Sequence, residues 1–216
     1  MSDAVIVVPA NEAPWEDIRA VFGTRGASSI CWCQRYKLAP REAFSRFPAE
    51  ERAARLRGQT SAGSPEASST SGLVAYLDGQ PAGWCAVEPR PAYEGLLRVY
   101  RTPWEGRDEN RADESVWAVT CILVRPGFRG RGIAYALARA AVDHAGARGA
   151  RALEAYPMRT EAGEITWDEV HVGAQSVFAA AGMDEVSRPG KRRAVMRIDL
   201  DGMASNPSTS NEERHG

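Results

Sequence analysis

The sequence predicts an α/β domain built around a mixed sheet. Three observations lead to this fold class: a hairpin signal at Asp78-Gly79, a nearly continuous apolar strand over residues 116–124, and two strand–helix–strand passages in the second half of the chain. The chain has 216 residues, of which 44% are hydrophobic, and this suits one domain with a core of its own. We therefore expect a single domain over residues 1–200 and a disordered polar tail over 201–216.

The chain begins with a strand and two helices. Residues 4–8 are apolar and rich in valine, which favours a short strand. Residues 14–22 predict a helix, and Asn11 is available as its cap. Residues 48–57 predict a second helix, because two glutamates lie in its first turn and its arginines follow. Between the two helices, residues 30–36 form an apolar and aromatic patch without a clear period.

A hairpin follows the second helix, and a long connection follows the hairpin. Residues 59–72 are rich in serine, threonine and glycine, so we expect a flexible loop. Strands over 73–77 and 82–88 flank Asp78-Gly79, which suits the positive φ angles of a tight turn. The charged connection over 89–114 is long enough to indicate a functional segment, and we interpret it as a lid.

The second half of the chain contains the predicted central strand. Residues 116–124 are apolar almost without interruption, which predicts a strand with both faces covered, and Pro126 ends it. The next segment repeats apolar residues at helical spacing. The expected elements are helix 132–147, strand 152–156, helix 170–181, and strands 183–186 and 194–200.

Composition excludes several classes of protein. The formal net charge is −1, so nothing global favours a nucleic acid or a membrane surface as partner. The sequence contains no run of 18 or more apolar residues, so no transmembrane helix is expected. Its N-terminus lacks the pattern of a secretory signal, and we therefore expect a cytoplasmic protein. Its cysteines should then be reduced, and we expect no metal site, since Cys31-x-Cys33 lacks the usual zinc spacing.

The most informative feature is the turn between the central strand and the following helix. Gly130 and Gly132 let the backbone approach a ligand closely, and Arg129 and Arg131 add charge. A turn that leads into a helix points backbone N–H groups and the positive helix end at one place, which favours a phosphate or pyrophosphate. The turn is neither a nucleotide P-loop nor a dinucleotide fingerprint, because neither glycine pattern is present.

In this turn the sequence resembles the GNAT superfamily of N-acetyltransferases. The family signature, [Gln/Arg]-x-x-Gly-x-[Gly/Ala], is matched from Arg129 to Ala134, after Val124-Arg125-Pro126. The chain is also similar to an uncharacterised bacterial branch of this superfamily, in the segments Cys31-Trp32-Cys33, Gly83-Trp84-Cys85, Trp117–Cys121, Glu154–Pro157 and Val195–Arg197. The resemblance implies a mixed, mostly antiparallel twisted sheet with helices on both faces.

The resemblance also implies acetyl-CoA as cosubstrate and a set of residues that bind it. The backbone of the turn would hold the pyrophosphate, and the strand before it would pair with the pantetheine amides. Many relatives place a tyrosine where this chain has Phe178, which would pack in the core or against the pantetheine. The implied cofactor residues are Ile122, Leu123, Val124, Arg129, Gly130, Arg131, Gly132, Ile133, Ala134, Tyr135 and Phe178.

Acetyl transfer needs a neutral amine and a leaving thiolate. By resemblance, Glu154 is our candidate general base, since its apolar neighbours could raise its pKa, and the alternative is a carboxylate paired with an arginine. Glu88 is the second candidate, whereas Asp168 and Glu169 look like the solvated start of a helix. Because Phe178 cannot donate a proton, Tyr156 is the candidate acid, with water or no acid as alternatives.

These features together predict an N-acetyltransferase that moves an acetyl group from acetyl-CoA to a primary amine of a small molecule, by direct transfer in a ternary complex. Two alternatives remain: a protein lysine or N-terminal acetyltransferase, and a non-catalytic acyl-CoA-binding regulatory module. A homodimer is expected by resemblance alone. Dispersed aromatic residues could converge on an apolar or cation–π acceptor pocket; they are Trp32, Tyr36, Trp84, Tyr93, Trp104, Tyr156 and Trp167.

Overall fold

One seven-stranded sheet organises the protein. The structure, a computed structural model, describes residues 4–159 and 172–200. The strand order is β1-β2-β3-β4-β5-β7-β6, and β4–β5 is the parallel pair among antiparallel neighbours. The expected mixed, mostly antiparallel sheet is confirmed. The strands are β1 (Val5–Pro9), β2 (Leu73–Leu77), β3 (Gln80–Pro89), β4 (Val116–Val124), β5 (Ala152–Ala155), β6 (Asp184–Ser187) and β7 (Val195–Asp199).

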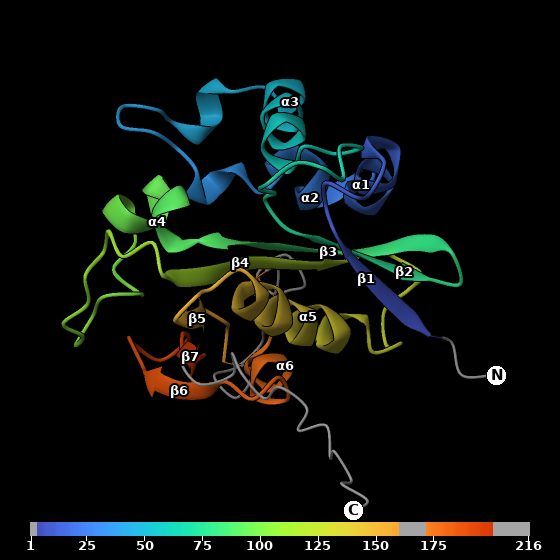
Figure 1. The fold of residues 1–216 in the computed structure, drawn as a ribbon. Helices are drawn as coiled ribbons and strands as arrows, with labels where there is room; N and C mark the ends of the chain where they lie inside the picture. Colours follow the sequence, from blue (N-terminus) through green and yellow to red (C-terminus); the bar gives the residue numbers. More distant parts are fainter. Residues whose placement is uncertain (1–3, 160–171, 201–216) are drawn as a thin grey trace, which may run out of the picture.

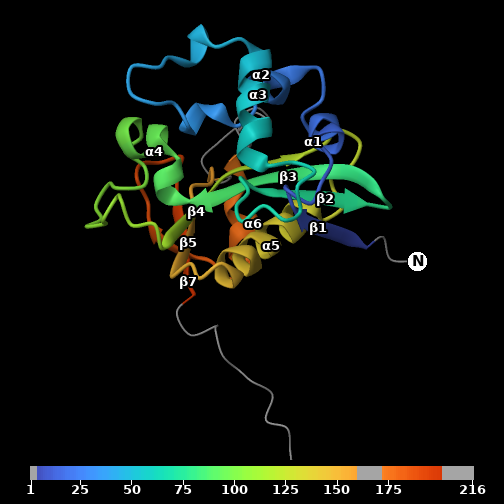
Figure 2. The ribbon, with the colours of Figure 1, turned by 45° about the horizontal axis from the view of Figure 1, so that its top comes forward.

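Helices cover both faces of the sheet (Figure 1). One face carries α1 (Trp15–Phe22), α2 (Gly26–Cys31) and α3 (Ala49–Thr60), and the other carries α5 (Ile133–Ala147) and α6 (Gln175–Ala179). Figure 2 shows α4 (Glu94–Val99) beside the far end of β3 and β4. Short 3-10 helices are η1 (Gln34–Tyr36), η2 (Phe44–Arg46) and η3 (Arg90–Ala92). No described helix has both the length and the apolar content needed to cross a bilayer.

Each face of the sheet has its own core. Under α5, Ile133, Leu137 and Ala141 are buried against β2, β3 and β4, at the helical spacing seen in the sequence. Under α1, the fully buried Trp84 meets Phe22, whose ring stacks on Trp32 with centroids 4.7 Å apart. Burial of such large side chains contributes roughly 1.5–3 kcal/mol each, so these two layers hold the helices on the sheet.

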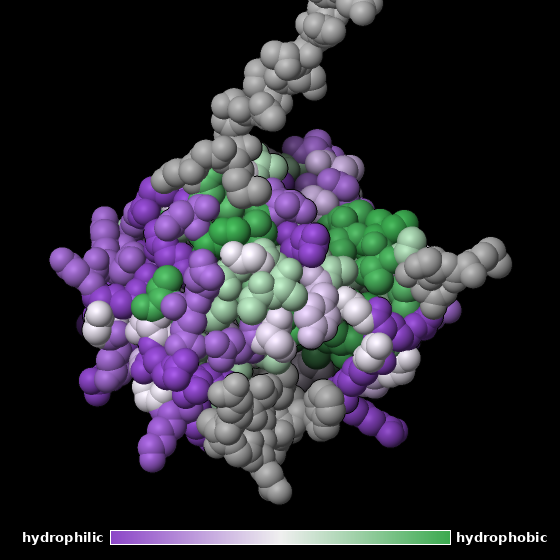
Figure 3. Space-filling view, turned by 90° about the horizontal axis from the view of Figure 1, so that it is seen from below, coloured by the Kyte–Doolittle hydropathy of each residue, from purple (hydrophilic) through white to green (hydrophobic). Residues whose placement is uncertain are grey.

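The outer surface of the α5 face is mixed in character. In Figure 3 hydrophilic side chains cover much of this face, and hydrophobic atoms gather in separate patches between them. In β1, Val5 and Val7 pack against the core under α5, whereas Ile6 between them points to the other side of the sheet and is 61% exposed. β1 pairs only with β2 among the described strands, so it forms an edge of the sheet.

The predicted hairpin is confirmed, and one predicted cap is wrong. Asp78 and Gly79 have φ angles of 51° and 73°, as a type I′ turn requires. The N-cap of α1 is Pro14, and Asn11 instead donates hydrogen bonds from its amide to carbonyl oxygens of the 59–72 segment. The Thr70 hydroxyl donates a further bond to the Thr60 carbonyl, so this segment is tied to the ends of β1 and α3.

Some elements differ from the sequence prediction. Helices α2 and α4 lie in segments for which no helix was expected, and both are only six residues long. Helix α6 is shorter than expected, and the first two residues of the predicted 170–181 helix lie outside the described residues. The predicted tail over 201–216 also lies outside them.

The strand β4 runs past the end of β5. Pairing between the two strands extends from Val116↔Ala152 to Val119↔Ala155, where β5 stops. On the other edge of β4, Ala86 pairs with Cys121 and Val87 pairs with Val119, so Thr120 is an extra residue without a partner. This β-bulge reverses which side chains face α5 and bends the strand where it leaves β5. The last part of β4 therefore has one open edge.

Close packing of α5 on β3 depends on Gly83. A Cβ atom at this position would lie 2.7 Å from a methyl carbon of Ile133 and 3.0 Å from Leu137. We expect Gly83→Val to lower the free energy of unfolding by about 1–3 kcal/mol, because the side chain would push α5 away from the sheet. Urea denaturation followed by circular dichroism measures this change.

Gly58 provides the matched control. It lies inside α3, and a Cβ atom there would meet no heavy atom within 4 Å. Gly58→Ala should raise the free energy of unfolding by about 0.5–1 kcal/mol, because alanine loses less entropy in a helix. Equal stability of Gly83→Val and the native protein would contradict the close contact between α5 and β3.

Candidate cofactor and acceptor site

A cleft opens where β4 continues beyond β5. Its volume is about 740 Å³, within the range of small-molecule sites. One wall is the last part of β4, from Cys121 to Val124, and the next is the turn that leads into α5. Gly173, Ala174 and Val177 contribute a third wall at α6. Residues of α2 and of the segment after it form the remaining side, including Cys31, Cys33 and Arg35.

The turn before α5 presents backbone amides to this cleft. Gly130 and Gly132 both have φ angles of 77°, a left-handed conformation that glycine adopts at little cost. Among the described residues, no backbone acceptor bonds the amides of Gly130, Gly132, Ile133, Ala134 or Tyr135, whereas Ala136 already donates to the Gly132 carbonyl. Free amides at the positive end of a helix of 15 residues are the groups that bind a pyrophosphate.

Most of the predicted cofactor residues lie together on this cleft. They come from β4, from the turn and from the first residues of α5, which the chain joins without interruption. The predicted residues that line the cleft are Ile122, Leu123, Val124, Arg129, Gly130, Gly132, Ile133, Ala134 and Tyr135. Their role in cofactor binding remains a prediction.

Two predicted cofactor residues lie elsewhere. The Arg131 guanidinium is 3.4 Å from the Asp78 carboxylate in the β2–β3 turn, and both side chains are substantially exposed. Phe178 is fully buried in the core below the cleft. A Cβ atom on Gly173 would lie 2.6 Å from its ring, so Phe178 supports the α6 wall from behind rather than lining the cleft.

The family model agrees with this geometry. The model described as the acetyltransferase (GNAT) family matches residues 32–163, which is more than half of the chain. The chain belongs to the acetyltransferase (GNAT) family. Acetyl-CoA is the acetyl donor of this family, and the free amides of the turn suit its pyrophosphate. No curated protein is significantly similar to the chain in sequence.

Solved structures show the same fold at low sequence identity. A proposed acetyltransferase from Salmonella typhimurium, solved with its cofactor acetyl-CoA, is 14% identical, with a TM-score of 0.51 over 95% of this chain and 99% of that one. A GCN5-related N-acetyltransferase from Kribbella flavida is 19% identical, with a TM-score of 0.50 over 91% and 98%. Another acetyltransferase is 18% identical, with a TM-score of 0.52 over 90% and 99%. These likenesses concern the fold alone.

Glu154 lies in a buried ion network rather than on the cleft. Its side chain is fully buried, and it accepts hydrogen bonds from Arg90 at 3.1 Å, Arg107 at 2.5 Å and Arg197 at 2.9 Å. Burial acts to raise the pKa of Glu154, but the charges of Arg107 and Arg90 outweigh it, and the pKa is lowered. The expectation of a raised pKa is wrong, and the geometry fits the alternative of an arginine-paired carboxylate.

Tyr156 belongs to the same network. Its hydroxyl donates a hydrogen bond of 2.9 Å to Glu154, and its side chain is buried. Burial and the charge of Glu154 raise the pKa of Tyr156 well above its usual value. Neither residue lines the cleft. The proton of Tyr156 is therefore held by Glu154, and this arrangement does not favour Tyr156 as a proton donor.

Glu88 lies at the same end of the sheet as Glu154, but it has different neighbours. It pairs with Ala118 across β3 and β4, and its carboxylate accepts a hydrogen bond from Lys37. Lys37 also donates to the Ser71 hydroxyl at 3.2 Å. The side chains of Glu88 and Lys37 are 12% and 7% exposed, so the pair lies just below the surface.

Two buried hydroxyl groups lie near Glu88, which itself does not line the cleft. Those of Tyr93 and Thr120 are within reach of each other, and neither has a hydrogen-bond partner in any other described residue. Burial raises the pKa of Tyr93 well above its usual value, the Glu88 charge adds to this, and the Thr120 hydroxyl opposes it, so the three groups are neighbours. Thr120 is the bulge residue and precedes Cys121, which lines the cleft. Unpartnered buried hydroxyls of this kind suit bound water.

The cysteines lie near one another without forming a metal site. Hydrogen bonding with Cys121 and burial raise the pKa of the Cys33 thiol well above its usual value. Burial also raises the pKa of Cys85 and, together with Cys33, that of Cys31. No group of His, Cys, Asp and Glu side chains in the described part of the chain is placed to hold a metal ion.

The expected aromatic pocket does not form from the predicted residues. The described members of that set are buried, and none lines the cleft; they are Trp32, Tyr36, Trp84, Tyr93, Trp104 and Tyr156. Trp167 lies outside the described residues. Phe22, Phe44 and Phe128 provide aromatic surface in the cleft instead.

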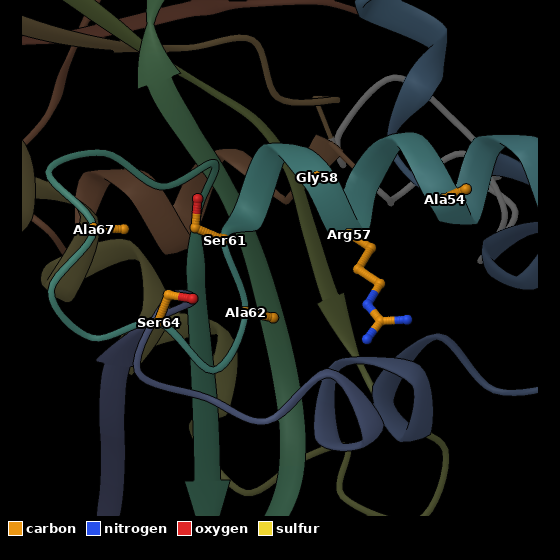
Figure 4. Close-up of a pocket in the computed structure, with 7 residues that line it drawn as sticks. All are labelled: Ala54, Arg57, Gly58, Ser61, Ala62, Ser64 and Ala67. Carbon is orange, nitrogen blue, oxygen red and sulfur yellow. The ribbon is translucent and has the colours of Figure 1, made fainter.

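A second, shallow hollow lies beside the end of α3 (Figure 4). It shares no lining residue with the cleft. Arg57 is the one charged side chain that lines it, and this side chain is exposed. Nothing in this hollow indicates a ligand. Its lining residues are Ala54, Arg57, Gly58, Ser61, Ala62, Ser64 and Ala67.

Sequence reasoning missed the α2 side of the cleft. Residues 25–35 include Cys31-Trp32-Cys33, one of the segments that carry the family resemblance, but they have no clear period and no pattern that predicts contact with the cleft. The aromatic and cysteine-rich patch over 30–36 was the available signal. It pointed to an unusual segment without indicating what that segment faces.

The ion network predicts a pH-dependent loss of stability in Glu154→Gln. The glutamine would remove the buried one of two carboxylates that three arginines share, leaving them the partly exposed Glu109, and we expect a loss of about 3 kcal/mol at pH 7. Because the folded pKa of Glu154 is lowered, the native carboxylate stabilises the fold above its unfolded pKa near 4.5. That contribution is lost as the pH falls through the folded pKa, so the difference between the proteins should shrink below pH 4.5.

Chemical denaturation at several pH values measures this difference. Glu105→Gln is the control, because Glu105 is exposed and its nearest pairing with Arg101 is 3.8 Å long. That substitution should change the free energy of unfolding by less than about 0.5 kcal/mol. A Glu154→Gln protein as stable as the native one at pH 7 would refute the structural role of this carboxylate.

Proposed function

We propose that this protein transfers the acetyl group of acetyl-CoA to a primary amine of a small molecule, directly and within a ternary complex. The observation that carries the proposal is the set of backbone amides of Gly130, Gly132, Ile133, Ala134 and Tyr135, which no described backbone acceptor bonds and which lie at the cleft beside β4. Membership in the acetyltransferase (GNAT) family supports the acetyl transfer.

The cofactor's parts match the parts of the cleft. The amides of Gly130, Gly132 and Ile133 would hold the pyrophosphate, and the open edge of Ile122–Val124 would bond the pantetheine amides as a neighbouring strand does. When bound, acetyl-CoA supplies the activated acetyl thioester. Cys121 and Cys33 would then lie at the acetyl end of the cleft.

We propose Glu88 as the general base in place of Glu154. A base has to accept a proton from the acceptor amine, and three guanidinium groups already hold the Glu154 carboxylate away from the cleft. Glu88 does not line the cleft either, but it has one cationic partner, and the Tyr93 and Thr120 hydroxyls near it lead to Cys121 on the cleft wall. Water bound by these hydroxyls would carry the proton to Glu88. The thiolate would leave without a dedicated acid, since Tyr156 donates its proton to Glu154.

Two alternatives make different predictions in one assay. A protein lysine or N-terminal acetyltransferase would release thiol from acetyl-CoA with peptides and not with small amines. An acyl-CoA-binding module would bind acetyl-CoA tightly and release no thiol with any acceptor. We further propose a cytoplasmic homodimer, on the resemblance to the family alone, and analytical ultracentrifugation would measure the oligomeric state.

Gly132→Asp should abolish measurable binding of acetyl-CoA. The carboxylate would enter the proposed pyrophosphate site, where its charge repels phosphate. A Cβ atom at Gly132 meets no heavy atom within 4 Å, so any loss of binding would not come from a steric clash in the fold. Isothermal titration calorimetry with acetyl-CoA measures the effect.

Gly190→Asp is the matched control for this substitution. Gly190 also has a positive φ, 83°, and open space around it, but it lies between β6 and β7. Its backbone strain should therefore be comparable, while its affinity for acetyl-CoA should equal that of the native protein. Native affinity in Gly132→Asp would refute the proposed position of the cofactor.

Glu88→Gln should lower kcat/KM about 100-fold at pH 7, within the usual range for loss of a general base. The difference in kcat/KM between Glu88→Gln and the native protein should become smaller as the pH rises toward the pKa of the acceptor amine, because more of the amine is then already deprotonated. Calorimetry should give an unchanged affinity for acetyl-CoA. Glu88→Asp, which keeps the carboxylate, should retain part of the activity. A pH-independent loss would indicate a structural role for Glu88.

A further inference from the structure

The charge on the cleft wall indicates what kind of amine it accepts. We infer that the acceptor carries a carboxylate or similar acidic group beside its amine, and that Arg35 binds this group. The inference rests on the proposed function, because it assigns the acceptor of the same cleft. It is carried by the position of Arg35, by the charge of the cleft and by the contacts of the arginine.

Arg35 lies at the end of the cleft that is opposite the phosphate-binding turn. The turn with Gly130 and Gly132 marks one end, and β4 leads from there back to Cys121. The Cys33 thiol, two residues before Arg35, is a hydrogen-bonding neighbour of Cys121. Arg35 therefore belongs to the end where the acetyl group and the acceptor would meet.

The described lining of the cleft contains three arginines and no acidic residue. They are Arg25, Arg35 and Arg129, and no Asp, Glu or Lys side chain joins them. Arg129 adjoins the turn, where the cofactor phosphates would account for a positive charge. Arg35 is at the other end, too far along the cleft to be paired with these phosphates. An acceptor that carries a positive charge and no carboxylate would find no negatively charged side chain in this lining, whereas a carboxylate on the acceptor could pair with Arg35.

The Arg35 guanidinium has no carboxylate partner among the described residues. It lies over the Phe44 ring, whose centroid is 4.9 Å from the guanidinium carbon. The ring holds one face of the guanidinium and leaves its N–H edge to a ligand. Arg55 on α3, by contrast, is paired with acidic side chains, since it donates to Glu42 and Glu51.

A second cation, Arg193, lies behind the cleft wall near Tyr36 and does not line the cleft itself. Arg193 donates one hydrogen bond of 3.0 Å to the Tyr156 carbonyl, just beyond β5. Burial raises the pKa of Tyr36 to about 12, and the charges of Arg193 and Arg35 act against this rise, so both guanidinium groups lie near the Tyr36 hydroxyl. Of these groups Arg35 is the one that lines the cleft, and a guanidinium forms strong hydrogen bonds with a carboxylate.

Matched amines that differ only in the acidic group test this inference. The probes are 6-aminohexanoate with hexylamine, and phenylalanine with phenylalaninamide and phenethylamine, each assayed by thiol release from acetyl-CoA. We expect the acidic member to have a kcat/KM about tenfold or more above its neutral partner, since a charge-assisted bond is worth about that factor.

Arg35→Gln should abolish this preference. The acidic acceptors should lose about tenfold in kcat/KM, mostly through KM, while the neutral acceptors and the affinity for acetyl-CoA stay unchanged. Arg35→Lys should restore part of the preference, because the charge remains without the planar fork. Arg139→Gln, an exposed arginine on α5 outside the cleft, is the control and should change neither quantity.

The outcomes separate this inference from the proposed function. Transfer to neutral amines as fast as to acidic ones, or a preference that survives Arg35→Gln, would overturn the role of Arg35 and leave the acetyltransferase intact. Binding of acetyl-CoA without transfer to any probe or peptide would overturn the proposed function, and this inference with it. A preference for the acid that is lost in Arg35→Gln alone would establish the inference.

Discussion

The point at which β4 and β5 separate determines the rest of the molecule's functional geometry. Parallel pairing ends at Val119↔Ala155, and β4 continues for five more residues with an open edge. Below this point the Glu154 carboxylate binds guanidinium groups from β7 and from the connection after β3. The network therefore fastens three chain segments at the closed end of the cleft, while the backbone beyond it is left unpaired.

This division explains why two carboxylates at one end of the sheet have different properties. Glu154 and Glu88 both pair with Ala118, on opposite edges of β4. Glu154 is enclosed by cations and serves the fold, whereas Glu88 has one lysine and adjoins unpartnered hydroxyl groups. Position on a strand alone does not distinguish the two, because the difference lies in residues brought from elsewhere in the chain.

Local chemistry predicted the elements on which the cofactor end depends. The Asp78-Gly79 turn, the apolar run of β4 and the glycines before α5 each act within a few residues, and each is found as expected. The roles of Glu154 and of the α2 segment could not be predicted in this way. Arg90 is 64 residues from Glu154 in the sequence, and no local pattern indicates that the two side chains meet. The short helices α2 and α4 likewise depend on tertiary contacts rather than on their own propensity.

The extra residue in β4 has a consequence for comparing this strand among homologues. Before Thr120 the side chains of Trp117 and Val119 join the core under α5, and after it Ile122 and Val124 do so, so odd positions give way to even ones. Because of this change from odd to even positions, the sequence of β4 does not show the regular alternation of apolar and polar residues that is typical of a half-buried strand. Because Thr120 is the extra residue, its removal would leave a regular alternation, with Cys121 and Leu123 still in the α1 layer. A sequence gap placed at Thr120 would therefore keep every side chain on its own face, whereas a gap placed later in β4 would assign the residues between Thr120 and the gap to the wrong face.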